Sequence, residues 1–230
     1  MKLRIAFALW SLVVLTLLAS CATTNSPQGV AQGLLTAING LDYAKAKSYA
    51  DANALNTINA IEALTASLTE KNAAIKSSQK ITIASIEEKE GETLVSYSIG
   101  DHAAILSAKK VGDDWKVTKL GYELVAYLIQ NTPAAVVEAF ITALDSFNIE
   151  MSIPLADPET QTSLKSVADK IQDIDPEVLA KAPKLDHPSI LDVSENGDTA
   201  AVRYKVGKED VADLVKVNGV WKITLKTGGD

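Results

Sequence analysis

The chain has 230 residues, of which 47% are hydrophobic and 5% aromatic, and a formal net charge of −7 at pH 7. This acidic balance argues against nucleic-acid binding, because phosphates need a basic surface, and against electrostatic adhesion to anionic lipid. The single cysteine cannot form an internal disulfide. The length exceeds that of most single domains, so an internal repeat is the first pattern to test.

The N-terminus has the pattern of a secretory signal. Lys2 and Arg4 precede an apolar stretch at 5–18, which is too short to span a bilayer stably. Leu18-Ala19-Ser20-Cys21 follows and resembles the lipobox of bacterial lipoproteins. We therefore expect a lipoprotein signal peptide at 1–20. An ordinary secretory signal or an uncleaved membrane anchor is the alternative.

The lipobox resemblance implies cleavage between Ser20 and Cys21 and acylation (palmitate) of Cys21. Such an anchor explains a lone cysteine in an exported protein, since more than one acyl chain is needed to hold a protein stably on a bilayer. Ala22 follows in place of the aspartate that retains lipoproteins in the inner membrane, which implies the outer membrane of the cell envelope if the host is Gram-negative. Removal of Lys2 and Arg4 would leave 20 basic against 29 acidic residues, a net charge of −9.

The rest of the chain contains a tandem repeat at an offset of 106 residues, as from position 27 to position 133. The matches run from the first expected helix to the last expected strand without net insertion: Pro27 with Pro133, Val30 with Val136, Leu34 with Phe140, Ala37 with Ala143, Asp51 with Asp157, Gly91-Glu92-Thr93 with Gly197-Asp198-Thr199, and Trp115-Lys116-Val117-Thr118 with Trp221-Lys222-Ile223-Thr224. We therefore expect a lipidated tether at 21–25, domains at 26–120 and 132–230, and a connector at 121–131.

Each copy is expected to begin with helices. Ser26-Pro27 and Thr132-Pro133 combine a capping hydroxyl with proline at the first helical position. Asp51 and Asp157 then predict a further helix in each copy, which runs to about residue 76 or about residue 181. In the second copy Asp175-Pro176-Glu177 is expected to break this helix and restart it.

The remainder of each copy alternates with a period of two residues, which is typical of strands. The expected strands are 81–87, 93–99, 105–111 and 115–120 in the first copy, and 185–193, 199–206, 211–217 and 220–225 in the second. Asn196-Gly197 and Asn218-Gly219 are strong hairpin signals. The sequence therefore predicts an α+β fold with helices packed on one face of a mainly antiparallel four-stranded sheet in each copy.

A combination of motifs resembles a known family. A proline-started helix, Gly40-Leu41-Asp42-Tyr43-Ala44-Lys45-Ala46, a strand opening on Gly-Asp/Glu-Thr, and Lys-Val before Trp-Lys-Val/Ile are similar to the small lipoprotein domains of unknown function in the nuclear transport factor 2-like superfamily. The resemblance covers both copies, and the second departs from it at 148–154, where Pro154 weakens the short second helix. It implies a cone-like domain, a curved sheet around helices, often with a cavity at the wide end.

That superfamily includes ketosteroid isomerase-like enzymes and dehydratases as well as binding domains, so the fold alone does not decide function. No catalytic residue of those enzymes maps onto this chain. His102 and His187 are not equivalent positions of the repeat, and we expect both on the surface, with a general base as the alternative. The sequence has no zinc-ligand cluster, glycine-rich phosphate loop or Gly-x-Ser-x-Gly motif, so we expect no cofactor, no metal and no enzyme activity.

Two groups of residues allow both a structural and a binding interpretation. Asp169, Asp173, Asp175 and Glu177 could suggest calcium, but they lack the glycine and terminal acid of a calcium loop, and helix capping by Asp175 with solvated charges explains them better. Trp115 and Trp221 could be ligand platforms, but their equivalence in two alternating strands favours core packing.

The connector at 121–131 carries six large apolar residues, unlike a flexible linker, so we expect the two domains to be docked. Residues 22–125 carry a net charge of −2 and 126–230 a net charge of −7, so the domain further from the anchor is the acidic one. We expect a membrane-anchored, non-enzymatic binding or protein-interaction module, whose partner is an envelope protein or a small ligand. A carrier of a small apolar ligand in the cone cavity is the first alternative, and an isomerase-like enzyme is the second.

Overall fold

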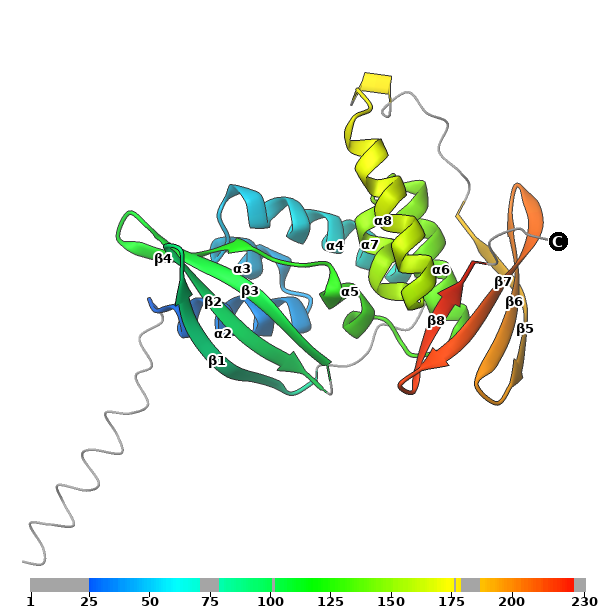
Figure 1. The fold of residues 1–230 in the computed structure, drawn as a ribbon, viewed down its shortest axis with the longest axis horizontal. Coiled ribbons are helices and arrows are strands. Elements are labelled where there is room, and N and C mark those ends of the chain that lie inside the picture. The colour runs from blue at the N-terminus through cyan, green and yellow to red at the C-terminus, as the bar shows by residue number, and fades with distance from the viewer. Residues whose placement is uncertain (1–24, 71–78, 101, 176, 179–186, 226–230) are drawn as a thin grey trace, which may run out of the picture.

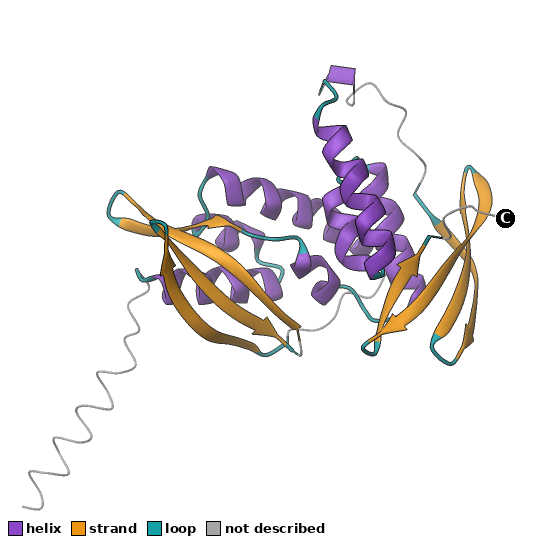
Figure 2. Cartoon of the chain, in the orientation of Figure 1, coloured by secondary structure: helices purple, strands orange, loops and turns teal. Residues whose placement is uncertain are grey.

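The computed structural model describes residues 25–70, 79–100, 102–175, 177–178 and 187–225. Two successive halves, 25–120 and 132–225, each combine helices with one four-stranded antiparallel sheet. Figures 1 and 2 show the N-terminal half on the left, the C-terminal half on the right and helices between the two sheets. The expected α+β class is confirmed. Residues 1–24 lie outside the described residues, and they contain the expected signal peptide at 1–20, Cys21 and all of the expected tether at 21–25 except Asn25.

Caps in the sequence begin the helices as expected. In the N-terminal half the helices are α2 (Pro27–Asn39), α3 (Tyr43–Ser48) and α4 (Ala52–Glu70); in the C-terminal half they are α6 (Pro133–Asp145), α7 (Ile149–Ser152), the 3₁₀ helix η1 (Ile153–Leu155) and α8 (Pro158–Gln172). Ser26 accepts a hydrogen bond from Gly29 N, and Thr132 does the same for Ala135 N. Helix α8 ends before Asp175, whose Oδ1 accepts from Glu177 N at 2.8 Å. The helix break expected there is confirmed.

The strands follow the predicted alternation closely. They are β1 (Ile81–Lys89), β2 (Glu92–Ile99), β3 (His102–Val111) and β4 (Asp114–Lys119), then β5 (Ser189–Asn196), β6 (Thr199–Val206), β7 (Lys208–Val217) and β8 (Val220–Thr224). Each sheet is a simple meander in chain order. One difference is that β3 begins at His102, three residues before the start expected from the sequence.

One helix in each half lies across its own sheet. Helix α2 contacts all four strands of the first sheet, and α6 contacts β5, β6 and β8 of the second. The buried faces of both sheets and the helices between them belong to one continuous hydrophobic cluster. The two halves therefore share a core, which fixes their relative position.

The duplication is visible in individual hydrogen bonds. Asn25 Nδ2 donates to Asp113 O and Asn25 Oδ1 accepts from Trp115 N, so this side chain clamps the β3–β4 hairpin to the start of α2. Asn131 clamps the β7–β8 hairpin in the same way, through Gly219 O and Trp221 N. The hydrogen-bond partners of Asn25 and Asn131 are themselves 106 positions apart. The repeat therefore includes equivalent side-chain contacts as well as equivalent residues.

The constant offset expected for the repeat fails inside the first hairpin of each sheet. Thr93 is 3% exposed but Thr199 is exposed, and the buried counterpart of Thr93 is Ala200. The β-bulges also have an offset of 107 in place of 106, since they lie at Ile83/Ser85 in β1 and at Ile190/Asp192 in β5. The second half is thus shifted by one residue in β5 and β6. The shorter β6–β7 turn restores the offset of 106, so that no net insertion remains.

The connector forms a short helix, α5 (Glu123–Leu128), between the halves. It packs against η1, and Leu124, Val125, Tyr127, Leu128 and Ile129 are all buried. Gln79 of the first half donates a hydrogen bond to Tyr127 O, and Tyr122 OH accepts one from Asn148 of the second half. The expectation of a docked connector is confirmed. Within the described ranges, no helix is long and apolar enough to cross a membrane.

Candidate functional site

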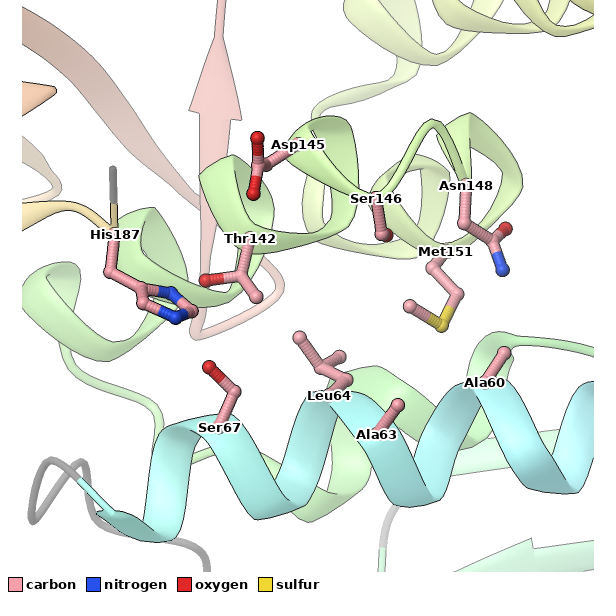
Figure 3. A pocket seen from close by; sticks show the side chains of 10 residues that line it. All are labelled: Ala60, Ala63, Leu64, Ser67, Thr142, Asp145, Ser146, Asn148, Met151 and His187. Atoms are coloured by element: carbon pink, nitrogen blue, oxygen red, sulfur yellow. The ribbon is translucent and has the colours of Figure 1, made fainter. Parts of the chain in front are cut away.

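A groove of about 350 Å³ lies where α4 of the first half meets α6 and α7 of the second. Its lining residues come from both halves: Ala60, Ala63, Leu64, Ser67, Thr142, Asp145, Ser146, Asn148, Met151 and His187. Figure 3 shows α4 as the floor of the groove and the α6–α7 segment as the facing wall, with His187 at one end and Asn148 at the other. The volume lies within the range of small-molecule sites.

The floor of the groove is apolar. Helix α4 contributes Ala60, Ala63 and Leu64, and Met151 reaches toward them from α7 (Figure 3). Leu64 and Met151 are 3% and 2% exposed, so the groove opens directly onto the shared core. Small alanines on α4 leave the space that larger side chains would fill, which is why a hollow persists at this contact between helices.

The wall formed by α6 presents hydrogen-bond acceptors. The Thr142 hydroxyl donates to Glu138 O, and the Ser146 hydroxyl donates to Ala143 O, each at 2.8 Å. With the single proton of each hydroxyl used in these bonds, the lone pairs of both oxygens are what the wall offers to a ligand. Asp145 adds a carboxylate to the same wall. Asn148 Nδ2 donates to Tyr122 OH at 3.3 Å, which directs one amide proton away from any ligand.

The donors of the groove are fewer. Ser67 on α4 and His187, two residues before β5, carry the remaining polar side chains, and Figure 3 shows both at the same end of the groove. His187 is exposed, as expected for a surface residue. The side chain of His102 is not described. The structure therefore brings one of the two histidines to this groove.

The acidic group of the sequence does not converge on a site. Asp169 lies on the exposed side of α8, and Asp173 and Asp175 follow the end of that helix. Among the described residues, no three His, Cys, Asp or Glu side chains come close enough to hold a metal ion. Capping by Asp175 is the role that the hydrogen bond to Glu177 N supports.

The two tryptophans differ in burial. Trp221 is 3% exposed, and Lys216 Nζ lies 4.4 Å from the centre of its ring. Trp115 is only half-buried and lines a shallow hollow beside the β1–β2 turn, which carries Glu88, Glu90 and Glu92. The core role expected for both is therefore confirmed for Trp221, whereas Trp115 packs on the core with part of its ring in solvent.

A buried tyrosine hydroxyl lies under the connector. Tyr97 is 1% exposed, and its OH has no hydrogen-bond partner among the described residues. Burial, together with Tyr127 and Glu123 nearby, raises the pKa of Tyr97 far above its usual range. This phenol therefore stays neutral, and it occupies a position in β2 that Tyr204 fills in β6.

The sequence reasoning missed the groove, although a signal for it exists. Positions that differ in polarity between the two copies mark the contact between the halves. Leu64 corresponds to Lys170, and Met151 corresponds to Lys45, and both lysines are exposed. Where a repeat position is apolar in one copy and lysine in the other, the pattern indicates a surface that only the first of these copies buries.

Comparison with protein-family models, with curated proteins and with solved structures finds no match to this chain.

Proposed function

We propose that this protein is a lipid-anchored, non-enzymatic binding protein of the cell envelope. The lipobox-like Leu18-Ala19-Ser20-Cys21 supports an acyl anchor on Cys21, and the Ala22 that follows supports the outer membrane in a Gram-negative host. The observation that carries the binding function is the groove between α4 and α6, with an apolar floor and a wall of acceptors.

The proposal includes two cone-like domains of the nuclear transport factor 2-like type, at 26–120 and 132–230. The contact of α2 with every strand of its sheet supports this arrangement. So do the β-bulges in β1 and β5, because a bulge bends a strand and increases its twist. The ligand site, however, lies between the two domains and not inside either cone.

The chemistry of the groove selects a class of ligand. An apolar floor takes an aliphatic or aromatic body, and a wall with Thr142, Ser146 and Asp145 takes groups that donate hydrogen bonds. A carboxylate also favours a positive charge, in keeping with the net charge of −7 of the second part of the chain. We therefore propose a small amphiphile with an ammonium, amide or hydroxyl donor.

The test uses matched alkyl probes and a matched pair of variants. Octylammonium and octanoate share an apolar chain and differ in the charge of the head group, and calorimetry measures their binding to the mature chain carrying Cys21→Ser. Ala63→Trp fills the groove from an exposed position of α4, and the control Asp169→Trp places the same side chain at the equivalent position of α8.

We expect octylammonium to bind more tightly than octanoate. Ala63→Trp should weaken binding by about tenfold or more, equivalent to about 1.4 kcal/mol, whereas Asp169→Trp should leave it unchanged. Asp145→Asn should reduce the preference for the ammonium head group. Equal binding to the two tryptophan variants, or a preference for octanoate, would show that this groove is not the site proposed here.

A further inference from the structure

The connector covers one face of the C-terminal half, and the equivalent face of the N-terminal half is a second surface of interest. In the C-terminal half, Ala126 and Ile129 of the connector segment lie over Leu155 and Trp221, and all four line one cavity of about 10 Å³. Leu155 and Trp221 are 2% and 3% exposed as a result. The connector thus acts as a lid on this end of the second half.

The N-terminal half has an equivalent face, and the positions that correspond to Ala126 and Ile129 are 20 and 23, which lie outside the described residues. We name Tyr49, Trp115 and Lys116 the anchor face, because they correspond to Leu155, Trp221 and Lys222 in the repeat. Tyr49 and Trp115 are both half-buried and pack on the core, with the ring of Tyr49 beside Gly33 of α2. Tyr49 O accepts a hydrogen bond from Val117 N, which holds Tyr49 beside β4.

Cleavage of the expected signal peptide would remove most of the segment equivalent to the connector helix. The positions that correspond to α5 are 17–22, and cleavage before Cys21 would remove all of them except Cys21 and Ala22. A different occupant must therefore cover the exposed parts of Tyr49 and Trp115, or these aromatic rings stay in water.

Chain length brings the acyl anchor to this face. Asn25 is bound through its side chain to Asp113 O and Trp115 N, at 2.9 and 2.8 Å. Only four peptide units separate Asn25 from Cys21, which reach at most about 14 Å when fully extended. An acylated Cys21 lies at the bilayer surface, so the β3–β4 hairpin must lie close to it.

We propose that the anchor face rests on the phospholipid bilayer, at the level of the head groups. The inference depends on the acyl anchor of the proposed function. Trp and Tyr are the side chains preferred at membrane interfaces, since they present an apolar body with a polar tip, and Lys116 adds a long amphipathic stem. The hollow beside Trp115 carries Lys89 as well as Glu88, Glu90 and Glu92, and Glu92 pairs with Lys109 at 2.8 Å, so we propose a contact that does not depend on anionic head groups.

The mature chain has only two tryptophans, which makes a direct test possible. The acylated full chain is reconstituted in phosphatidylcholine vesicles with or without bromine on the acyl chains, as the single-tryptophan variants Trp221→Phe and Trp115→Phe. Bromine quenches tryptophan only at short range. We expect brominated vesicles to remove most of the Trp115 emission and to leave Trp221 emission unchanged.

A pair of introduced cysteines gives an independent reading, because acylation blocks the only native thiol. A solvent-sensitive fluorophore on Lys45→Cys, one helical turn from Tyr49, should shift to the blue on vesicle binding, and the same label on exposed Thr162→Cys should not. Vesicle flotation of every variant reports the anchor itself. Flotation with unquenched Trp115 and no shift at Lys45→Cys would overturn the orientation and leave the anchor intact; loss of flotation would overturn both.

Discussion

Trp221→Ala should destabilise the protein strongly, and more than the equivalent Trp115→Ala. Trp221 is 3% exposed and closed in by the connector, so its loss leaves a cavity and should cost about 3 to 5 kcal/mol. The cation–π contact with Lys216 adds about 0.5 to 1 kcal/mol. Trp115 already has part of its ring in solvent, so its removal should cost only about 1 to 3 kcal/mol.

Urea unfolding of the mature chain with Cys21→Ser measures both effects. Far-UV circular dichroism follows the whole fold, while the remaining tryptophan reports the half that has not been mutated. Because buried residues of both halves form one cluster, we expect the two signals to shift together in each variant. Phe at each site is the control, since it retains most of the apolar volume.

Two results would refute this reasoning. If Trp115→Ala lost as much free energy of unfolding as Trp221→Ala, or more, burial under the connector would not explain the contribution of Trp221. Unchanged Trp115 fluorescence transitions in Trp221→Ala would show that the halves unfold independently, and that the shared core does not couple them.

Three further variants test local features, each by the same urea titration. Asn131→Ala removes the clamp on the β7–β8 hairpin and should lower the free energy of unfolding by about 1 to 3 kcal/mol, because two hydrogen bonds are lost. An unchanged free energy of unfolding would show that the clamp does not stabilise the fold. Glu90→Asn should stabilise by about 0.5 to 1 kcal/mol, because φ is +51° there and Asn tolerates that conformation; a loss would contradict it. Burial alone would raise the pKa of Asp157, but hydrogen bonds from Thr160 and Glu159 lower it. The ionised carboxylate therefore stabilises the fold above about pH 4, and this stabilisation is lost at lower pH. Asp157→Ala lacks this stabilisation, so its free energy of unfolding should fall less steeply with acid than that of the parent protein.

The sequence predicts secondary structure well here because local signals agree with tertiary burial. Both first helices begin at a hydroxyl and a proline, and the side chains of β2, β6 and β8 alternate in burial. The short helix α7 (Ile149–Ser152) followed by η1 confirms the effect expected of Pro154.

Hairpin register shows where local signals fail. Asn218 and Gly219 both have positive φ, as their turn requires, so the prediction at this hairpin is correct. Asn196-Gly197 carries the same signal, yet Asn196 pairs with Thr199 and the turn contains Gly197 and Asp198. Burial of the β6 side chains outweighs the preference of the dipeptide, since a slip of one residue would turn the apolar face of the strand to solvent.

The groove could not be predicted from either copy alone, because it exists only where two copies meet. Helix α4 ends the helical layer of the first half and meets α6, so its contact positions are apolar, as in Ala63 and Leu64. Helix α8 is its equivalent in the second half and meets no further copy in this chain, and Asp169 and Lys170 stand exposed at the same positions. A repeat array needs such a polar outer face at its end to remain soluble. The charged surface of α8 and the apolar groove beside α4 therefore reflect one difference between the copies, because among the described residues only α4, of these two helices, packs against a helix of the other copy.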